Sequence, residues 1–178
     1  MVKFLEGKLK LKVNREKSAV ASVIYRKFLG FSFYFAKSGA RIRVHLKSYD
    51  RLKAKMKGIT GRNKAMSMET RITKLNLSIR GWVNYFRIAD MKNQIREHDE
   101  WLRRRLRMCY WKQWKKIGTK HRNLVRLGIP EGKAWEYANT RKGYWRIANS
   151  PILKCSLTKD YFKGMGLHTL TMVYDSVR

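Results

Sequence analysis

The chain has 178 residues, of which 42 are Lys or Arg and 12 are Asp or Glu, so its formal net charge is +30. Such a charge opposes compaction unless a polyanion supplies counter-charge, and the candidates are nucleic acid and an anionic membrane. Hydrophobic residues make up 44% of the chain and there are 2 prolines, which argues against a disordered protein. The composition predicts one compact domain, or one domain with a smaller appendage.

A membrane is the weaker of the two candidates. The longest apolar run, residues 28–36, is interrupted by Gly30 and Ser32 and is too short to span a bilayer. Residues 1–6 include a glutamate and further lysines follow, so no apolar stretch as long as the core of a signal peptide is expected there. We therefore expect a cytoplasmic protein that binds nucleic acid and no membrane. Cys109 and Cys155 lie far apart in the sequence, so free thiols are expected.

The first expected elements are β-strands. Residues 9–13 alternate Leu and Lys and precede a turn at Asn14 and Arg15, which predicts a strand. Residues 28–35 are rich in aromatic side chains, Ser38 and Gly39 favour a turn, and residues 41–45 alternate again, so the two segments are predicted to form a hairpin.

From Leu46 onward the pattern is helical. Breaks near residues 58–61, 118, 128–130, 143, 150–151 and 164–166 predict about five or six helices. The predicted fold class is mainly α: a helical bundle preceded by a small antiparallel β-hairpin, which makes the chain α+β overall.

One helix carries a clear apolar stripe. Its members follow helical spacing and predict a buried face: Ile72, Leu75, Ile79, Trp82, Val83 and Phe86. Arg80, Asn84 and Arg87 share another stripe of the same helix, and Gly81 is expected to allow close packing.

Residues 101–122 form the most basic stretch, with nine Lys and Arg and no acid. A helix from about Trp101 to Lys116 would place one set of residues on an apolar face: Leu102, Leu106, Cys109, Tyr110 and Ile117. It would place another set on the opposite half: Arg103, Arg104, Arg107, Trp111, Trp114 and Lys115. Arginine beside exposed tryptophan suits phosphate binding and base stacking. The alternative is that both tryptophans pack against a neighbouring helix.

A second basic and aromatic group spans residues 141–146. Tyr144 and Trp145 could stack on bases or close the core, and Gly143 could allow close backbone approach. Asp99 and Glu100 are expected to pair weakly with Arg103 and Arg104 one turn later. The full set of candidate RNA-binding residues is Arg80, Arg87, Arg103, Arg104, Arg107, Trp111, Lys112, Lys115, Lys116, Lys120, Arg122, Arg141, Lys142 and Arg146.

The sequence predicts no catalytic residue, metal site or cofactor. The aspartates are scattered without an adjacent pair, so a two-metal site has no evident ligands. The four histidines show no metal-ligand spacing with one another or with the cysteines, and no phosphate-binding loop is present.

Residues 75–86, Leu-Asn-Leu-Ser-Ile-Arg-Gly-Trp-Val-Asn-Tyr-Phe, resemble the signature of the group II intron maturase domain, also called domain X or the thumb. Residues 101–107, 111–116, 127–129, 142–146 and 150–151 continue that resemblance in the same order. Residues 9–17 and 27–31 resemble the last palm motifs of the same reverse transcriptases. In that resemblance Lys17 matches a palm lysine near the nucleotide site, and Gly30 lies where a strand grips the primer.

The resemblance implies a palm remnant at residues 1–45 and a helical thumb or domain X at residues 46–178. The catalytic Tyr-Ala-Asp-Asp motif precedes these segments in the family and is absent here, as is the Cys-rich endonuclease domain of some relatives. The implied function is binding of structured group II intron RNA to assist its splicing, with no enzymatic activity of the chain on its own. Three alternatives stay open. The chain could complete an active RNA-directed DNA polymerase together with a missing N-terminal portion, and then also bind RNA/DNA duplex. It could instead be a general basic RNA- or DNA-binding module, or a fragment without function.

Overall fold

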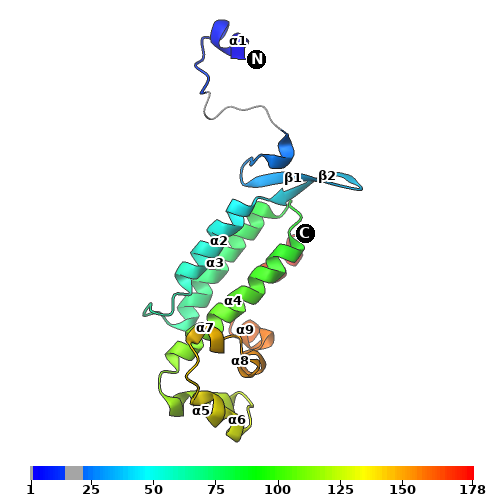
Figure 1. Cartoon of the computed structure of the whole chain (residues 1–178). Helices are drawn as coiled ribbons and strands as arrows, with labels where there is room; N and C mark the ends of the chain where they lie inside the picture. Colours follow the sequence, from blue (N-terminus) through cyan, green and yellow to red (C-terminus); the bar gives the residue numbers. More distant parts are fainter. Residues whose placement is uncertain (1, 15–21) are drawn as a thin grey trace.

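The computed structural model describes residues 2–14 and 22–178. A helical body, residues 46–178, carries a small hairpin at one end (Figure 1). Helix α1 (Val2–Gly7) and the 3-10 helix η1 (Val23–Tyr25) precede the hairpin. Residues 9–13 form no strand, so that prediction is wrong. Alternation alone does not make a strand, because the backbone groups need a neighbouring strand. Arg15 and Lys17 lie outside the described residues.

The predicted hairpin is confirmed. Strands β1 (Phe31–Ala36) and β2 (Gly39–Val44) pair antiparallel, with Phe31 opposite Val44. Gly30 joins the hairpin to the helices with a φ of +88°, and a Cβ there would lie 3.0 Å from Phe86 Cζ. The Ser48 hydroxyl donates to the Gly30 carbonyl at 3.0 Å. Gly30 is therefore a tight joint, for which glycine is suited by its backbone freedom.

The rest of the chain is helical, which confirms the mainly α fold class with its small antiparallel sheet. Its helices are α2 (Leu46–Ile59), α3 (Met68–Phe86), α4 (Lys92–Gln113), α5 (Ile117–Arg126), α6 (Glu131–Ala138), α7 (Tyr144–Ile147), α8 (Pro151–Ser156), α9 (Lys159–Gly164) and α10 (Leu170–Ser176). These are nine helices between residues 46 and 178, more than the sequence predicted. The last part divides into short helices because Ser150, Thr158 and Thr169 each cap a new N-terminus with the side-chain oxygen. Among the described residues, no helix is both long enough and apolar enough to cross a membrane.

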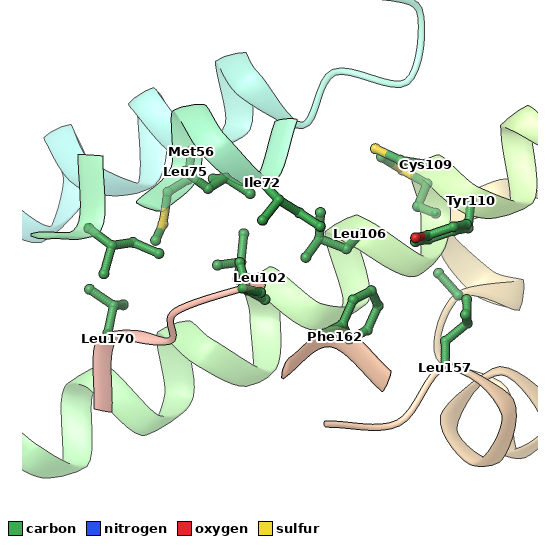
Figure 2. Packing of buried hydrophobic residues seen from close by; sticks show 14 of the residues in the cluster. Met56, Ile72, Leu75, Leu102, Leu106, Cys109, Tyr110, Leu157, Phe162 and Leu170 are labelled. Carbon is green, nitrogen blue, oxygen red and sulfur yellow. The ribbon is translucent and has the colours of Figure 1, made fainter. Parts of the chain in front are cut away.

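The core lies where α2, α3, α4, α9 and α10 meet. Figure 2 shows side chains of these helices converging, among them Leu75, Leu106, Phe162 and Leu170. The predicted apolar face of α3 is confirmed as buried, with Trp82 packed at its margin. Gly81 lies on the exposed side of α3 and a Cβ there would meet no atom within 4 Å, so the expected close packing is wrong.

Asp99 on α4 holds the last helix in place. Its side chain is buried, and its carboxylate accepts from the backbone N–H of Leu170 at 2.8 Å and of Thr171 at 3.0 Å. The Thr171 hydroxyl also donates to it at 2.7 Å. The expected weak surface pair with Arg103 is therefore wrong, because the carboxylate instead satisfies the free N–H groups at the start of α10.

Candidate nucleic-acid interface

Some arginines of the helical body serve the fold itself. Arg105 donates from Nε to the Thr60 hydroxyl at 3.0 Å and from Nη2 to the Thr60 carbonyl at 2.9 Å. Arg71 donates to the carbonyls of Ile59 at 2.6 Å and Lys64 at 2.7 Å. Both guanidinium groups thus occupy the C-terminal end of α2, where carbonyls lack helical partners and the helix dipole favours a cation. Burial lowers the pKa of Arg105.

The expectation that Arg107, Trp111 and Trp114 lie on an exposed face is wrong. Arg107 is 8% exposed and donates from Nε to the Leu157 carbonyl at 3.0 Å. Trp111 and Trp114 are 2% and 9% exposed and pack against each other edge to face. The alternative of helix packing is therefore correct for both rings, and Trp111 is not free to stack on a base. The cause is the central position of α4, which has neighbours on more than one side.

Two other members of the candidate set, Arg104 and Lys112, are half-buried and lie against aromatic rings of α7. Arg104 donates from Nε and Nη2 to the Trp145 carbonyl at 3.3 and 3.0 Å. Its guanidinium also lies 3.9 Å from the centroid of the exposed Trp145 ring. Lys112 Nζ lies 5.2 Å from the centroid of the Tyr144 ring. Each ring therefore receives a cation from α4, at a distance typical of cation–π contact.

Arg62 also belongs to this group, although it was not among the residues predicted from the sequence. It lies in the loop between α2 and α3, and its guanidinium is 5.1 Å from the Tyr144 centroid. A contact between positions 62 and 144 follows no helical spacing, so no local pattern could reveal it. We call the group formed by Arg62, Arg104, Lys112, Tyr144 and Trp145 the α4–α7 surface.

The remaining candidates surround this surface or lie apart from it. Arg103 is half-buried, and Lys120 Nζ lies 4.9 Å from the Trp111 centroid. Exposed side chains belong to Lys115, Lys116, Arg122, Arg141, Lys142 and Arg146. Arg80 and Arg87 are exposed on α3, and in the described part of the chain no contact joins them to the α4–α7 surface. Gly143 directly precedes α7. A Cβ there would meet no atom within 4 Å, so the backbone at Gly143 does not approach another part of the described chain closely.

The chemistry of the α4–α7 surface suits binding to an anion with aromatic parts. None of the ion pairs among the described residues involves Arg62, Arg104 or Lys112.

Across residues 2–14 and 22–178, no three His, Cys, Asp or Glu side chains are grouped to hold a metal ion. Cys109 is buried with its thiol donating to the Thr60 carbonyl at 3.3 Å, and burial raises its pKa. Cys155 is an exposed free thiol.

Residues 49–128 match the family model described as the group II intron, maturase-specific domain. The matched span begins in α2 and ends just after α5, so it contains Arg62, Arg104 and Lys112. Tyr144 and Trp145 of α7 lie beyond it. The comparison with curated proteins found no match.

Proposed function

We propose that this protein binds structured group II intron RNA and assists its splicing, because residues 49–128 match the model of the group II intron maturase-specific domain. In this role the protein holds the RNA in its active fold, and the RNA carries out the bond-breaking chemistry. The chain then acts as a binding partner and contributes no catalytic group.

The observation that supports RNA binding most directly is the α4–α7 surface. Three cations without a carboxylate partner lie on two aromatic rings there. A phosphate would not have to displace a carboxylate from these cations, and each neutralised phosphate would release condensed counterions. The rings and the guanidinium planes offer faces on which unstacked bases can lie.

The test is binding of a structured group II intron RNA across a salt series from about 50 to 300 mM, with a duplex DNA of equal length as competitor. We expect the protein to prefer the intron RNA at the higher salt, where sequence-independent attraction has faded. Equal affinity for both nucleic acids that disappears with salt would refute the proposal and favour a general basic module.

A matched pair of variants assigns the binding to the surface. Arg62→Glu with Lys112→Glu should weaken intron RNA binding and lower the magnitude of the salt slope by about 1 per residue. Lys55→Glu with Lys74→Glu changes the charge equally at exposed positions of α2 and α3 and should have a smaller effect. Circular dichroism should show both variants folded. Equal weakening by the two pairs would mean that net charge, and not this surface, carries the binding.

A further inference from the structure

An open cleft of about 560 Å³ lies beside the α4–α7 surface. Its lining includes the middle of α4, which contributes Glu97, Glu100, Trp101 and three arginines. Asn149 and Lys154 line it as well. The volume is within the range of clefts that hold one small ligand.

Arg107 gives this cleft a guanidinium group whose orientation is fixed. The side chain is 8% exposed, and its Nε donates to the Leu157 carbonyl, which sets the orientation of the guanidinium. Its two terminal nitrogens make no hydrogen bond in the described structure, and protein atoms do not enclose them completely. Because Arg107 lines the cleft, we take these nitrogens as the donors that it offers there. A largely buried cation without an anion is costly, so the site calls for an acceptor from outside. Burial and the nearby Arg103 lower the pKa of Arg107, and the group stays charged at neutral pH.

A ligand in this cleft would meet the carboxylates of Glu97 and Glu100 as well as the arginines. Acids are scarce in this chain, with 12 against 42 basic residues, yet two of them line this basic cleft. Both are exposed, and neither takes part in an ion pair among the described residues. Carboxylates repel phosphate, and they accept hydrogen bonds from N–H donors. The ligand should therefore carry donors close to its negative charge.

A nucleotide with an amino-bearing base meets both requirements. Carboxylates read base amino groups, and guanine presents its N1–H and N2–H side by side for the two oxygens of one carboxylate. Trp101, half-buried at the edge of the cleft, supplies an aromatic ring on which a base would stack in competition with Lys53 and Arg105, whose charged groups lie 5.4 and 5.7 Å from the ring centroid.

We propose that the cleft binds one unstacked guanine nucleotide of the RNA. Glu97 and Glu100 accept from the base, Trp101 stacks on it, and Arg107 with Arg103 binds the adjacent phosphate. This inference rests on the proposed function, because it assumes RNA as the ligand, and it adds a base-specific site that phosphate contacts alone would not provide.

The test uses fluorescence anisotropy of the full chain with labelled single-stranded RNA of about eight nucleotides at about 100 mM salt. The probes are oligouridine, the same oligomer with one central guanosine, and the same oligomer with one central inosine, which lacks the N2 amino group. We expect the guanosine oligomer to bind roughly tenfold more tightly than oligouridine, with inosine between them.

Glu97→Ala with Glu100→Ala should remove the preference for guanosine while oligouridine binds as well as before or better, since repulsion of phosphate is relieved. Glu131→Ala with Glu136→Ala makes the same charge change on α6 and should keep the preference. Equal binding of guanosine and uridine oligomers by the unmodified chain, or a preference that survives the first pair of changes, would overturn the cleft proposal. Binding of intron RNA without any binding of the oligomers would overturn it too. If the unmodified chain bound neither the oligomers nor the intron RNA, the proposed function would be overturned as well.

Discussion

The helical body, residues 46–178, and the N-terminal region before it differ in what happens to their large apolar side chains. In the body, Leu75 and Leu106 are 0% exposed. In the N-terminal region, Phe4, Phe28 and Phe35 are 53%, 66% and 66% exposed. A two-stranded hairpin cannot bury its own faces, whereas packed helices can. The stability of this protein therefore resides in the helices, and the hairpin depends on its attachment to them.

Besides the packing of Phe31 on Phe86 and the contact of Gly30 with Ser48, that attachment includes several polar contacts at one residue. Asp90, in the loop between α3 and α4, accepts from the Tyr34 hydroxyl at 3.1 Å and from Arg41 Nη1 at 3.5 Å in the hairpin. Arg178 Nη2 donates to it at 2.9 Å from the C-terminus. The Asp90 backbone N–H also donates to the Ile42 carbonyl at 2.8 Å. One carboxylate therefore joins the hairpin, the helical body and the end of the chain.

The largest expected effect comes from the core of the body. Leu106→Ala should lower the free energy of unfolding by about 2–5 kcal/mol, because it removes buried methyl groups and leaves a cavity. Urea denaturation followed by tryptophan fluorescence measures the change. Phe35→Ala in the hairpin is the control, and it should stay within about 0.5 kcal/mol of the unmodified chain. Similar losses in both variants would mean that the hairpin shares the cooperative core.

The next effect concerns Asp99 and the last helix. Asp99→Ala should cost about 1–3 kcal/mol, because the N–H groups of Leu170 and Thr171 lose their buried acceptor. Hydrogen exchange should report reduced protection in α10 before the global transition weakens. Glu100→Ala removes the same charge from an exposed neighbour and should leave α10 protected. If the amides of α10 were equally protected in both variants, the Asp99 cap would not stabilise that helix.

The fold was predictable from sequence where its causes are local. Turn residues between two β-prone segments predict the hairpin, and the spacing from Ile72 to Phe86 predicts the buried face of α3. The candidate site was harder, because its contacts join distant segments. Trp111 and Arg107 are covered by later parts of the chain that the pattern of α4 does not reveal. Arg62 reaches Tyr144 across the α2–α3 loop, and Asp99 caps a helix that begins 71 residues later. Residues 9–13 show the reverse case, a period-two pattern that finds no neighbouring strand.

The smallest expected effect tests the attachment of the hairpin through pH. The guanidinium of Arg178, followed by the Tyr34 hydroxyl, holds the pKa of Asp90 below its ordinary value of 3.8. Because the folded pKa is the lower one, the stabilisation is present above the ordinary value and is lost as pH falls through the folded value. Asp90→Asn should therefore reduce hydrogen-exchange protection of the β1 and β2 amides at about pH 7, by no more than about 1 kcal/mol, since the carboxylate is partly exposed.

The same measurement at about pH 3 should show a smaller difference between this variant and the unmodified chain, because that pH lies below the ordinary pKa of 3.8 and the stabilisation that comes from the lowered pKa is already decreasing there. Amides of α3 serve as the internal reference and should keep their protection in both proteins. Protection factors, which correct for the intrinsic exchange rate, make the two pH values comparable. A difference that grew on acidification, or one that spread equally into α3, would show that Asp90 stabilises the helical body and not the joint between body and hairpin.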